Sequence, residues 1–517
     1  MFSILSIASI VLLLYVLLTR HFRKSDPREP PLLLPRIPLV GHILGFLQQG
    51  VIYLDDLSKS PVFSLSILNY KIHIITDPSL VSTVHRSRDL TFDPIIVDMV
   101  SAMIGYSPNI LSLMQDTTHG GSSRYLADTY TSMQQSLVPG PRLWEMNAKV
   151  LEKTSHIVNG IGSNFDEKRL WYWIRDSFTK ATCETLFGIH HPLQDSSLVQ
   201  AVWDFDAYQI AIMLMPRVIS NIFPPTGRVL AAHGRARAAF RQFYADPNKC
   251  DHPSVSDMVR SRMKVNRLYG VPAEEMGNSE LGLIFVATTN AIPTLYWVIL
   301  YIFSNPKLVS ELRNHLEQSG VVTSAGDVEG TRKLRIDHTK FQERCPLLVA
   351  AYNETMRLTN LQPSIRVVRE DFVLSCGGIN EKGNPEGYLL KKGSLVMAPA
   401  RILHLSREIW GEDAEAFRHE RWLALTKVQK RAFIPFGGGK HLCPGRDFAF
   451  AEIVGTLAVL ILGFEITGSD GDVVRIPVGM ETKFGVAGPS EDGKALKIKV
   501  RRRPGWEDVV WEFGAGA

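Results

Sequence analysis

The first 24 residues pair an uncharged apolar stretch with a basic cluster. Phe2 to Leu18 is a run of 17 residues dominated by Ile, Leu and Val, at the short end of the length that spans a bilayer as a helix. The basic cluster at residues 20–24 follows it, whereas a cleavable signal peptide carries basic residues before its apolar stretch and a small-residue cleavage site after it. We therefore predict a transmembrane anchor and basic stop over residues 1–24, with the rest of the chain cytosolic. A cleaved signal peptide or a buried core helix is the alternative.

A proline-dense segment follows the predicted anchor. Its prolines, which exclude a helix, are Pro27, Pro30, Pro31, Pro35 and Pro38. Because extended proline-rich chain is stiff, we predict a hinge over residues 25–44 that holds a globular body at a fixed stance on the membrane. From about residue 45 to residue 505 there is no linker, repeat or low-complexity tract, so residues 45–517 are predicted to form one domain.

The hydrophobic pattern within residues 45–517 is mostly helical. Phe448–Leu462 is apolar nearly all round and Leu281–Phe303 is long and apolar, which predicts two buried helices, with a shorter one at Pro346–Leu358. Short β-like pieces lie among them at Val367–Leu374, Leu395–Met397 and Ala495–Val500. Helices mixed with a few short antiparallel strands favour a mainly α fold with minor β, an α+β domain. We expect Lys497–Arg503 to finish an edge strand that is followed by a solvated tail.

Composition and charge exclude several classes of protein. The 517 residues are 45% hydrophobic and 21% charged, which excludes collagen-like and disordered chains. Lys and Arg exceed Asp and Glu by 57 − 52 = 5 residues, too few for a dedicated nucleic-acid binder, so no nucleic-acid partner is expected. The five cysteines are odd in number and widely spaced, which argues against a disulfide framework and against a zinc site of C-x-x-C pairs.

One cysteine, Cys443, lies in a glycine-rich stretch before a predicted helix. Residues 437–439 are all glycine, which lets the backbone lie flat against a large planar ligand and adopt positive φ. Pro444 is favoured at the first position of a helix, so the thiol is placed at the amino end of Phe448–Leu462. The helix dipole and free N–H groups there stabilise a thiolate. A lone thiolate suits a single axial metal ligand, the alternative being a buried cysteine in a glycine-rich turn.

The same stretch resembles the heme-binding signature of the cytochrome P450 family, F-x-x-G-x-R-x-C-x-G. Phe436, Gly439, Cys443 and Gly445 match it, and His441 stands at the position of the family's arginine. The resemblance implies the cytochrome P450 fold, a bound heme (protoporphyrin IX iron) and the Cys443 thiolate as axial ligand of the iron. All five residues are then candidate heme-binding residues.

Two further motifs of the family are present in its order. Glu354 and Arg357 form its E-x-x-R, whose i,i+3 spacing puts both charges on one helix face. Residues 417–422 resemble its F-x-P-x-R-W/F, with His419 in place of the proline and Arg421 as the arginine. By resemblance, Arg421 joins Glu354 and Arg357 in a charge network that locks the core behind the heme. Because buried charges must be paired, this network is expected to be structural.

Within the family, the chain looks like the branch that contains cholesterol 7α-hydroxylase and prostacyclin synthase, and like a fungal-type member of secondary metabolism. The likeness rests on Ile365-Arg366, on residues 370–372 and on residues 287–293, Ala-Thr-Thr-Asn-Ala-Ile-Pro. These stretches follow the E-x-x-R helix or lie on the helix that carries the family's oxygen-activating pattern.

That pattern normally ends in an acid and a threonine that relay protons. Here Thr289 stands at the acid position and Asn290 at the threonine position, and an amide does not ionise. Pro293 removes a helical N–H and clashes with the carbonyl four residues back, so we predict a kink over the heme. We interpret Asn290 and the Thr289 region as catalytic groups that position water and oxygen. A packing kink without a chemical role is the alternative.

Candidate contacts to heme and substrate follow from the resemblance. Arg366 is the first candidate for the heme propionates because arginine pairs bidentately with carboxylates, and His441 is the second. Ligand sites are typically apolar with few polar anchors, so a terpenoid, a steroid or a similar secondary metabolite fits better than an acid or a nucleotide. By position in the family, the pocket residues are Ala287, Thr288, Ala291, Gln362, Ile365, Phe484 and Val486.

The resemblance as a whole implies a monooxygenase that hydroxylates or otherwise oxidises an apolar small molecule. It would be held in the endoplasmic reticulum membrane by one transmembrane helix, with its catalytic domain, residues 45–517, in the cytosol. Electrons from NADPH would arrive through NADPH-cytochrome P450 reductase, whose negative surface should meet basic residues near Cys443, Lys440 among them. Two alternatives stay open: a heme-thiolate isomerase or dehydratase that rearranges a peroxide without a reductase, and a non-catalytic heme-binding membrane protein.

Overall fold

The structure is a computed structural model of the chain. The described residues are 26–35, 41–57, 60–67, 70–95, 97, 106–116, 123–214, 224–328, 330–379, 385–482 and 484–514. The predicted anchor at residues 1–24 and residues 25 and 36–40 of the predicted hinge lie outside them. Residues 41–44 of that hinge begin the helix Gly41–Gln49. The membrane anchor therefore stays a prediction.

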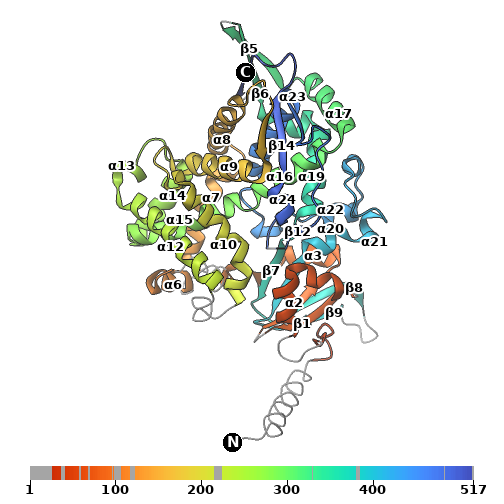
Figure 1. Ribbon diagram of the computed structural model, residues 1–517. Coiled ribbons are helices and arrows are strands. Elements are labelled where there is room, and N and C mark those ends of the chain that lie inside the picture. The colour runs from red at the N-terminus through yellow and green to blue at the C-terminus, as the bar shows by residue number, and fades with distance from the viewer. Residues whose placement is uncertain are drawn as a thin grey trace, which may run out of the picture. The chain divides into compact units, whose positions relative to one another are not determined.

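The chain folds into two compact units, which are described separately (Figure 1). The first unit takes residues 1–95, 361–414 and 426–442. The second unit takes residues 96–360, 415–425 and 443–517. Because each unit is assembled from segments far apart along the chain, residues 45–517 do not divide into two successive domains.

The first unit is built on a five-stranded sheet in the order β1-β2-β10-β7-β3. Its strands are β1 (Val62–Ile67), β2 (Tyr70–Ile75), β3 (Leu90–Thr91), β7 (Pro363–Val368) and β10 (Leu395–Pro399). β10 pairs parallel to β2, and the other neighbours pair antiparallel. The parallel pair differs from the prediction of antiparallel strands only, because these two strands come from distant segments and no hairpin joins them.

A turn interrupts the single strand predicted at Val367–Leu374. β7 ends before residues 369–371, and the next two strands form a hairpin: β8 spans Phe372–Ile379 and β9 spans Pro385–Leu390. The Asp371 carboxylate accepts a hydrogen bond from the backbone of Lys392 (2.9 Å). The charged residues 369–371 thus end one strand and precede another, so the prediction of one continuous strand was wrong.

The helices of the first unit are short. They are α2 (Gly41–Gln49), α3 (Pro78–Arg86), α4 (Asp93–Ile95), α20 (Ala400–Leu405), α21 (Arg407–Trp410) and α22 (Lys427–Ala432), with the 3₁₀ helices η1 (Gly50–Leu57) and η6 (Gly439–His441). α3 is capped by Asp77, whose side chain accepts from the backbone N–H groups of Ser79 and Leu80. Its last turn carries His85, which contributes to the site described below.

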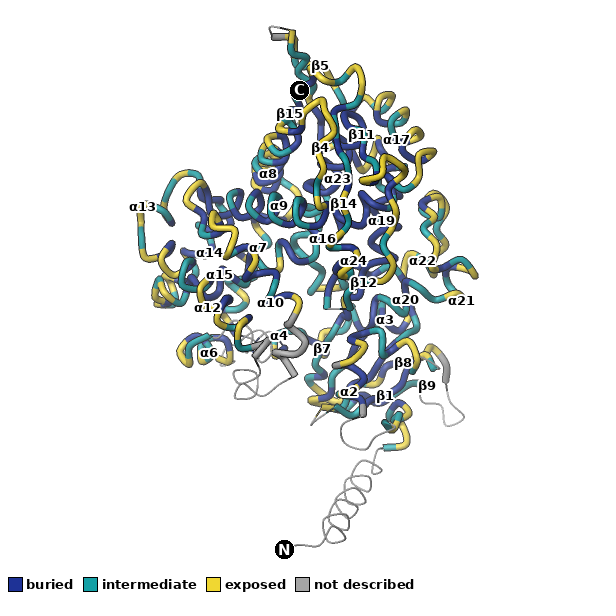
Figure 2. Tube along the Cα trace, in the orientation of Figure 1, coloured by how far each residue is buried: buried dark blue, intermediate teal, exposed yellow. Residues whose placement is uncertain are grey.

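The second unit is mainly helical. α16 (Ala291–Phe303) and α23 (Arg446–Gly463) are buried along most of their length, as their apolar sequences predict (Figure 2). The other helices are α6 (Pro108–Gln115), α7 (Arg124–Leu137), α8 (Pro141–Asn159), α9 (Leu170–Phe187), α10 (Ser196–Leu214), α12 (Pro224–Ala245), α13 (Pro247–Cys250), α14 (Asp257–Leu268), α15 (Ala273–Thr288), α17 (Pro306–Gln318), α18 (Phe341–Arg344), α19 (Pro346–Thr359) and α24 (Glu491–Ala495), with η3 (Pro192–Gln194), η4 (His338–Lys340) and η5 (His419–Leu423).

The long helix predicted at Leu281–Phe303 starts earlier and is interrupted. α15 ends at Thr288, α16 begins at Ala291, and Pro293 lies in the first turn of α16. The predicted kink is therefore confirmed as a break in the helix. Within the described ranges, Ala273–Phe303 is the one segment long and apolar enough to cross a membrane, but 78% of its most apolar window is buried, as in a core helix.

Three small sheets accompany the helices of the second unit. Two are antiparallel: β11-β14-β4 and the pair β12-β13. The third has the order β15-β6-β5. The strands are β4 (Asp166–Arg169), β5 (Val322–Val328), β6 (Thr331–Asp337), β11 (Phe464–Gly468), β12 (Met480–Glu481), β13 (Gly488–Pro489), β14 (Lys497–Arg502) and β15 (Val509–Gly514).

The residues after β14 form a strand, so the prediction of a solvated tail was wrong. β15 runs parallel to β6, and its residues Val509 and Trp511 are buried. On the other side of β15, the Asn159 side-chain amide pairs with the backbone of Trp511, as a neighbouring strand would. Asn159 Oδ1 accepts from Trp511 N (3.0 Å), and its Nδ2 donates to Trp511 O (3.1 Å). The alternation of apolar residues in β15 is a strand signal, but its partner strand is far away in the sequence.

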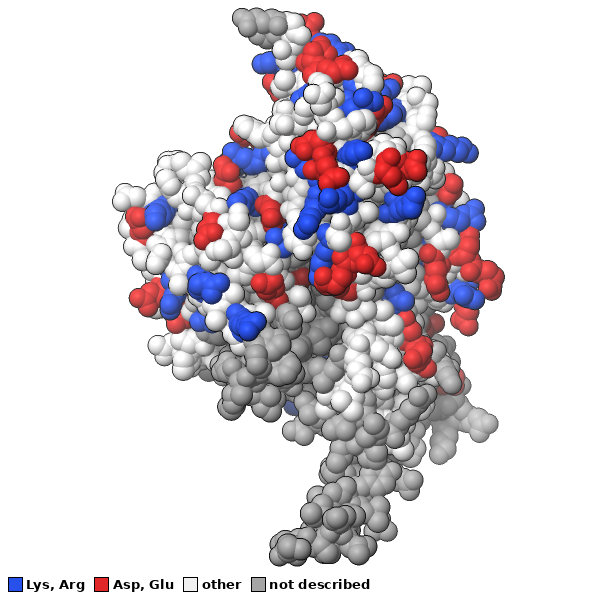
Figure 3. All heavy atoms as spheres, viewed as in Figure 1, with Lys and Arg blue, Asp and Glu red and all other residues white. Residues whose placement is uncertain are grey.

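Charged side chains of both signs are interspersed on the face shown in Figure 3. The formal net charge of the chain is small, at +5. A mixed surface keeps a protein soluble without creating an extended field of one sign.

Candidate functional site

Cys443 lies three residues before α23, at the amino end that the sequence predicted. Its side chain is half-buried, and the backbone N–H groups of Gly445 and Arg446 form hydrogen bonds with it. The Arg446 guanidinium donates to the Cys443 carbonyl (3.2 Å). The two N–H groups direct partial positive charge at the sulfur, which favours a thiolate.

Burial opposes these donors. It raises the pKa of Cys443 above its ordinary value, and the Gly445 and Arg446 N–H groups with the Arg446 charge offset only part of that rise. The protein by itself therefore favours the neutral thiol, and only a cation bound at the sulfur would reverse that preference. A metal ion supplies that charge and deprotonates a thiol ligand. Among the described residues, no group of three or more His, Cys, Asp or Glu side chains could hold a metal. Heme iron is an example of a metal that a single cysteine thiolate can hold.

In the first unit, the glycines before Cys443 are required by a neighbouring residue. Gly437 and Gly439 have positive φ angles of 69° and 64°. A Cβ added to Gly439 would overlap the backbone carbonyl of His85, and a Cβ added to Gly438 would overlap the His85 ring. The close approach of α3, which carries His85, is therefore a reason for these glycines in addition to the flat ligand surface that the sequence suggested.

Arg366 and His441, the two predicted propionate partners, are close together in the first unit. Arg366 is buried and donates to Gly438 O (3.0 Å) and to Ile365 O (2.7 Å). Burial, and then the Arg366 charge, lowers the pKa of His441 to about 4. An anion here would pair with Arg366 and favour a protonated His441. The cluster therefore fits a carboxylate, such as a heme propionate.

His85 belongs to the same cluster and was not predicted. Its Nε2 lies 2.9 Å from Ser364 Oγ, and burial followed by the Arg366 charge lowers its pKa to about 4. No local motif marks His85, because Ser364 lies 279 residues further along the chain.

Glu354 and Arg357 on α19 form a fully buried, bidentate ion pair. Arg357 donates from Nε to Glu354 Oε2 (2.9 Å) and from Nη2 to Glu354 Oε1 (2.8 Å). Arg421 Nε lies 3.4 Å from Glu354 Oε1, so the structure brings the predicted trio together. Two donors not foreseen from the sequence, Arg418 N (2.9 Å) and Trp422 Nε1 (3.0 Å), also reach this carboxylate. The buried charge is thus fully surrounded by partners, as its stability requires.

The threonines at the helix break donate to carbonyls of their own helix. Thr288 Oγ1 donates to Ile284 O (2.8 Å), and Thr289 Oγ1 donates to Phe285 O (2.9 Å). Both residues are buried. The Thr289 hydroxyl, at the position of the family's acid, therefore takes part in a bond within α15.

Asn290 is half-buried, and its side chain makes a tertiary contact. Asn290 Oδ1 accepts a hydrogen bond from Val486 N (2.9 Å), 196 residues further along the chain. A predicted catalytic residue and a predicted pocket residue are thus in direct contact. This bond gives the amide oxygen a structural partner, which favours the packing interpretation for that atom.

Val286 of α15 is exposed, although it is not among the predicted pocket residues. Val286 is 63% exposed, while Gly282 and Asn290, four residues before and after it, are half-buried. Positions i and i+4 lie on one helix face, and Gly282 contributes no side chain to it, so Val286 stands on an open face of α15 near the helix break. Among the predicted pocket residues, Thr288, Ala291 and Val486 are buried, Ala287, Ile365 and Phe484 are half-buried, and Gln362 is exposed.

Residues 484–487 form a loop, here named the 484–487 loop, that is held by the end of α19. Ala487 N donates to Thr359 O (2.8 Å), and Val486 forms a β-bridge with Asn360. The loop that carries two predicted pocket residues is therefore fixed to the helix of the E-x-x-R motif.

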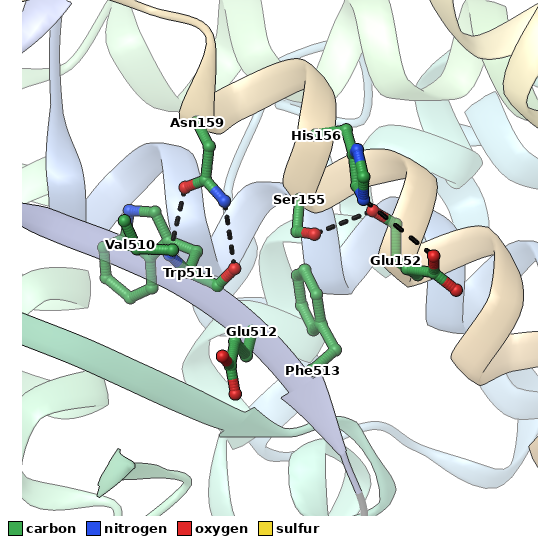
Figure 4. Close-up of a pocket in the computed structure, with 8 residues that line it drawn as sticks. All are labelled: Glu152, Ser155, His156, Asn159, Val510, Trp511, Glu512 and Phe513. Atoms are coloured by element: carbon green, nitrogen blue, oxygen red, sulfur yellow. Dashed lines mark hydrogen bonds and ion pairs between the residues drawn. The ribbon is translucent and has the colours of Figure 1, made fainter. Parts of the chain in front are cut away.

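A cavity of about 500 Å³ lies elsewhere in the second unit, where α8 and β15 meet (Figure 4). Its lining includes none of the predicted site residues. His156 lies 3.9 Å from Glu152, and Asn159 is engaged with the backbone of β15. The cavity is therefore separate from the candidate site. Its lining residues are Glu152, Ser155, His156, Asn159, Val510, Trp511, Glu512 and Phe513.

Comparisons with known proteins agree with the motifs. The family model described as cytochrome P450 matches residues 30–490. A cytochrome P450 monooxygenase of Gibberella zeae is 32% identical over 99% of this chain and 96% of its own length. The cholesterol 7-alpha-monooxygenase of Cricetulus griseus is 23% identical over 88% of this chain and 89% of its own length. The crystal structure of a cytochrome P450, CYP102L1, matches with a TM-score of 0.65 at 15% identity, covering 93% of this chain and 100% of that one, which supports the fold.

Proposed function

The chain belongs to the cytochrome P450 family of heme-thiolate monooxygenases, and from that membership we propose that it is a membrane-anchored enzyme that oxidises an apolar small molecule. The substrate class is a terpenoid, a steroid-like compound or another secondary metabolite. A relative named for cholesterol, an apolar polycyclic molecule, supports this class. The catalytic domain faces the cytosol at the endoplasmic reticulum membrane and takes electrons from NADPH-cytochrome P450 reductase.

Cys443 is the observation that carries this proposal. Its sulfur lies at the amino end of α23, with N–H groups of Gly445 and Arg446 directed at it. We assign it as the axial ligand of the heme iron. When bound, the heme supplies dioxygen activation: one oxygen atom enters a substrate C–H bond and the other leaves as water, with two electrons and two protons consumed.

The other heme contacts are proposed from the family's signature. Phe436, Gly439 and Gly445 hold the loop around the ligand cysteine. Arg366 pairs with a propionate through its fixed guanidinium fork, and His441 donates a second hydrogen bond. The support is the mutual proximity of Arg366 and His441, since the Arg366 charge lowers the pKa of His441.

The proposed pocket is apolar. Val286 presents an apolar side chain on the open face of α15, Gly282 adds no polar group to that face, and Phe484 and Val486 supply the loop. Side chains of this kind exclude water and bind an apolar ligand. The residues that stay proposed on the family's pattern alone are Ala287, Thr288, Ala291, Gln362 and Ile365.

With a reductase and its substrate, the purified full-length enzyme should consume NADPH and dioxygen and form product in proportion. The substrate is identified as the compound that accumulates when the encoding gene is deleted. Because Thr289 and Asn290 stand at the positions of the family's acid and threonine, the isomerase alternative is tested as well. Conversion of an organic peroxide without NADPH would replace the monooxygenase with that isomerase. Heme binding without either reaction would leave a non-catalytic heme protein.

Deleting residues 2–24 should shift much of the protein from the membrane to the soluble fraction while the heme stays bound. The reason is that the uncharged stretch Phe2–Leu18 lies outside the proposed heme site and is long enough to anchor the chain. Fractionation followed by heme absorbance measures the shift. The triple variant of Arg20, Arg23 and Lys24 to alanine keeps the apolar stretch and should remain in the membrane. Secretion of a protein cleaved near residue 20 would contradict the proposed topology.

A further inference from the structure

We propose that Asn290 is a positioning residue: its side-chain oxygen fixes the 484–487 loop against the break between α15 and α16 and thereby sets the shape of the substrate pocket. The inference rests on the proposed function for the meaning of that pocket, but the contact itself does not depend on a bound heme. It assigns Asn290 a role that acts through Val486.

Asn290 is bonded at both its backbone and its side chain. Its carbonyl oxygen accepts from Thr294 N (3.2 Å) and from Thr294 Oγ1 (2.8 Å), which fixes the residue at the start of α16. Its Oδ1 accepts from Val486 N (2.9 Å). The residue therefore joins the helix break to a loop that the sequence places near the end of the chain.

The same loop is held at the next residue. Trp297 Nε1 on α16 donates to Ala487 O (2.8 Å), and Ala487 N donates to Thr359 O (2.8 Å). Along the loop, Ala487 follows Val486 and Phe484 precedes it, so both Ala487 bonds lie on the side of Val486 away from Phe484. The bond from Asn290 thus adds a contact to the helix break on the Phe484 side of the Ala487 bonds.

Gly485 is matched to Asn290. Gly485 has a φ of 106°, and a Cβ added to it would overlap Asn290 Oδ1. Only a residue without a side chain lets the amide oxygen approach Val486 N at this point. The two positions therefore form a complementary pair.

A threonine at position 290 would not make this contact in the same way. Thr288, Thr289 and Thr294 each donate their hydroxyl to the carbonyl four residues back. A threonine at 290 would have the same local acceptor, and its side chain is one atom shorter than that of asparagine. The asparagine amide oxygen only accepts hydrogen bonds, so it does not bond to the backbone carbonyls of its own helix as a hydroxyl does. It can therefore accept the hydrogen bond from Val486 N.

The position of the contact explains its effect on the pocket. Asn290 lies four residues after Val286, just beyond the end of α15; Val286 is 63% exposed, and Gly282 has no side chain to fill the space beside it. Fixing Val486 to Asn290 therefore sets the separation between the 484–487 loop and the open face of α15 around Val286. A large ligand should respond to a change in this separation, whereas a small ligand should not.

Hydrogen exchange tests the contact directly in the full-length holoenzyme. Asn290→Ala should speed exchange of the Val486 amide by about tenfold, because the amide loses its acceptor. Asn290→Asp keeps an acceptor oxygen and should protect the amide as the parent does. Gly485→Ala should resemble Asn290→Ala, and Gly393→Ala is its control, since Gly393 also has positive φ (81°) but nothing within 4 Å of an added Cβ.

Azole binding to the ferric heme, followed by absorbance, tests the positioning role. For Asn290→Ala, the dissociation constant of 4-phenylimidazole should change at least about fivefold, and that of imidazole should stay within about twofold. Asn290→Asp should stay within about twofold for both ligands. If the Val486 amide of Asn290→Ala exchanged at the parental rate, the proposed contact would be overturned. If that amide exchanged faster but the dissociation constants of the two azoles did not respond differently, the role of the contact in the pocket would be overturned. A parent enzyme without a thiolate-heme spectrum would instead overturn the proposed function, while the exchange result would still decide the contact.

Discussion

Replacing Cys443 with serine should abolish the reduced carbon-monoxide absorption band of a thiolate heme. A serine hydroxyl does not ionise near neutral pH, so it cannot give the iron the thiolate that the site supplies. The two side chains are nearly isosteric and the position is only half-buried, so the protein should still fold. The measurement is the difference spectrum of the reduced, carbon-monoxide-treated enzyme. Cys443→His should lose the same band, because imidazole is a neutral ligand.

Cys376→Ser is the matched control, because Cys376 is an exposed cysteine on β8. It should keep the parental band at parental intensity. Circular dichroism of Cys443→Ser separates loss of the ligand from loss of the fold. A Cys443 variant that kept the band would remove this residue from the site, and with it the observation on which the proposed function rests.

Truncating Arg357 to alanine should lower the free energy of unfolding by about 3–5 kcal/mol, the usual cost of removing one partner of a buried ion pair. Both side chains of the Glu354–Arg357 pair are 0% exposed, so water cannot replace the lost guanidinium. Urea denaturation followed by circular dichroism measures the change. Arg357→Lys should cost less, since an ammonium keeps the charge but cannot form two parallel hydrogen bonds.

The control for this prediction is Lys392→Ala. Lys392 pairs with Glu370 at 3.0 Å, but the two side chains are 65% and 72% exposed, so the expected loss is under about 1 kcal/mol. Equal losses in Arg357→Ala and Lys392→Ala would show that the buried network does not support the fold.

The features that could be predicted from the sequence have local signals. α19 and α23 begin and end within two residues of Pro346–Leu358 and Phe448–Leu462, because apolar periodicity is carried by neighbouring residues. The break near Asn290 followed from Pro293, four residues away from the carbonyl it disrupts. The Glu354–Arg357 pair followed from its spacing on one helix face.

Features that depend on distant segments could not be predicted. The partner of Asn290 lies 196 residues away, so neither residue by itself indicates the bond. His85 meets Ser364 across 279 residues for the same reason. The burial of Thr288 could not be predicted from the helix sequence, because exposure depends on what packs against the helix.

β15 can pair with β6 only late in the synthesis of the chain. Its partner β6 leaves the ribosome early, since Arg335 on β6 and Glu512 on β15 are 177 residues apart. During that interval β6 has β5 on one side and an unpaired edge on the other. Charged residues on that edge, Arg332, Lys333 and Arg335, discourage pairing with a foreign strand. Asp508 and Glu512 then form ion pairs with these basic side chains once β15 has emerged. A message truncated before codon 509 would therefore yield a chain in which this edge of β6 stays unpaired. Such a chain should aggregate or be degraded more readily than the chain that carries β15.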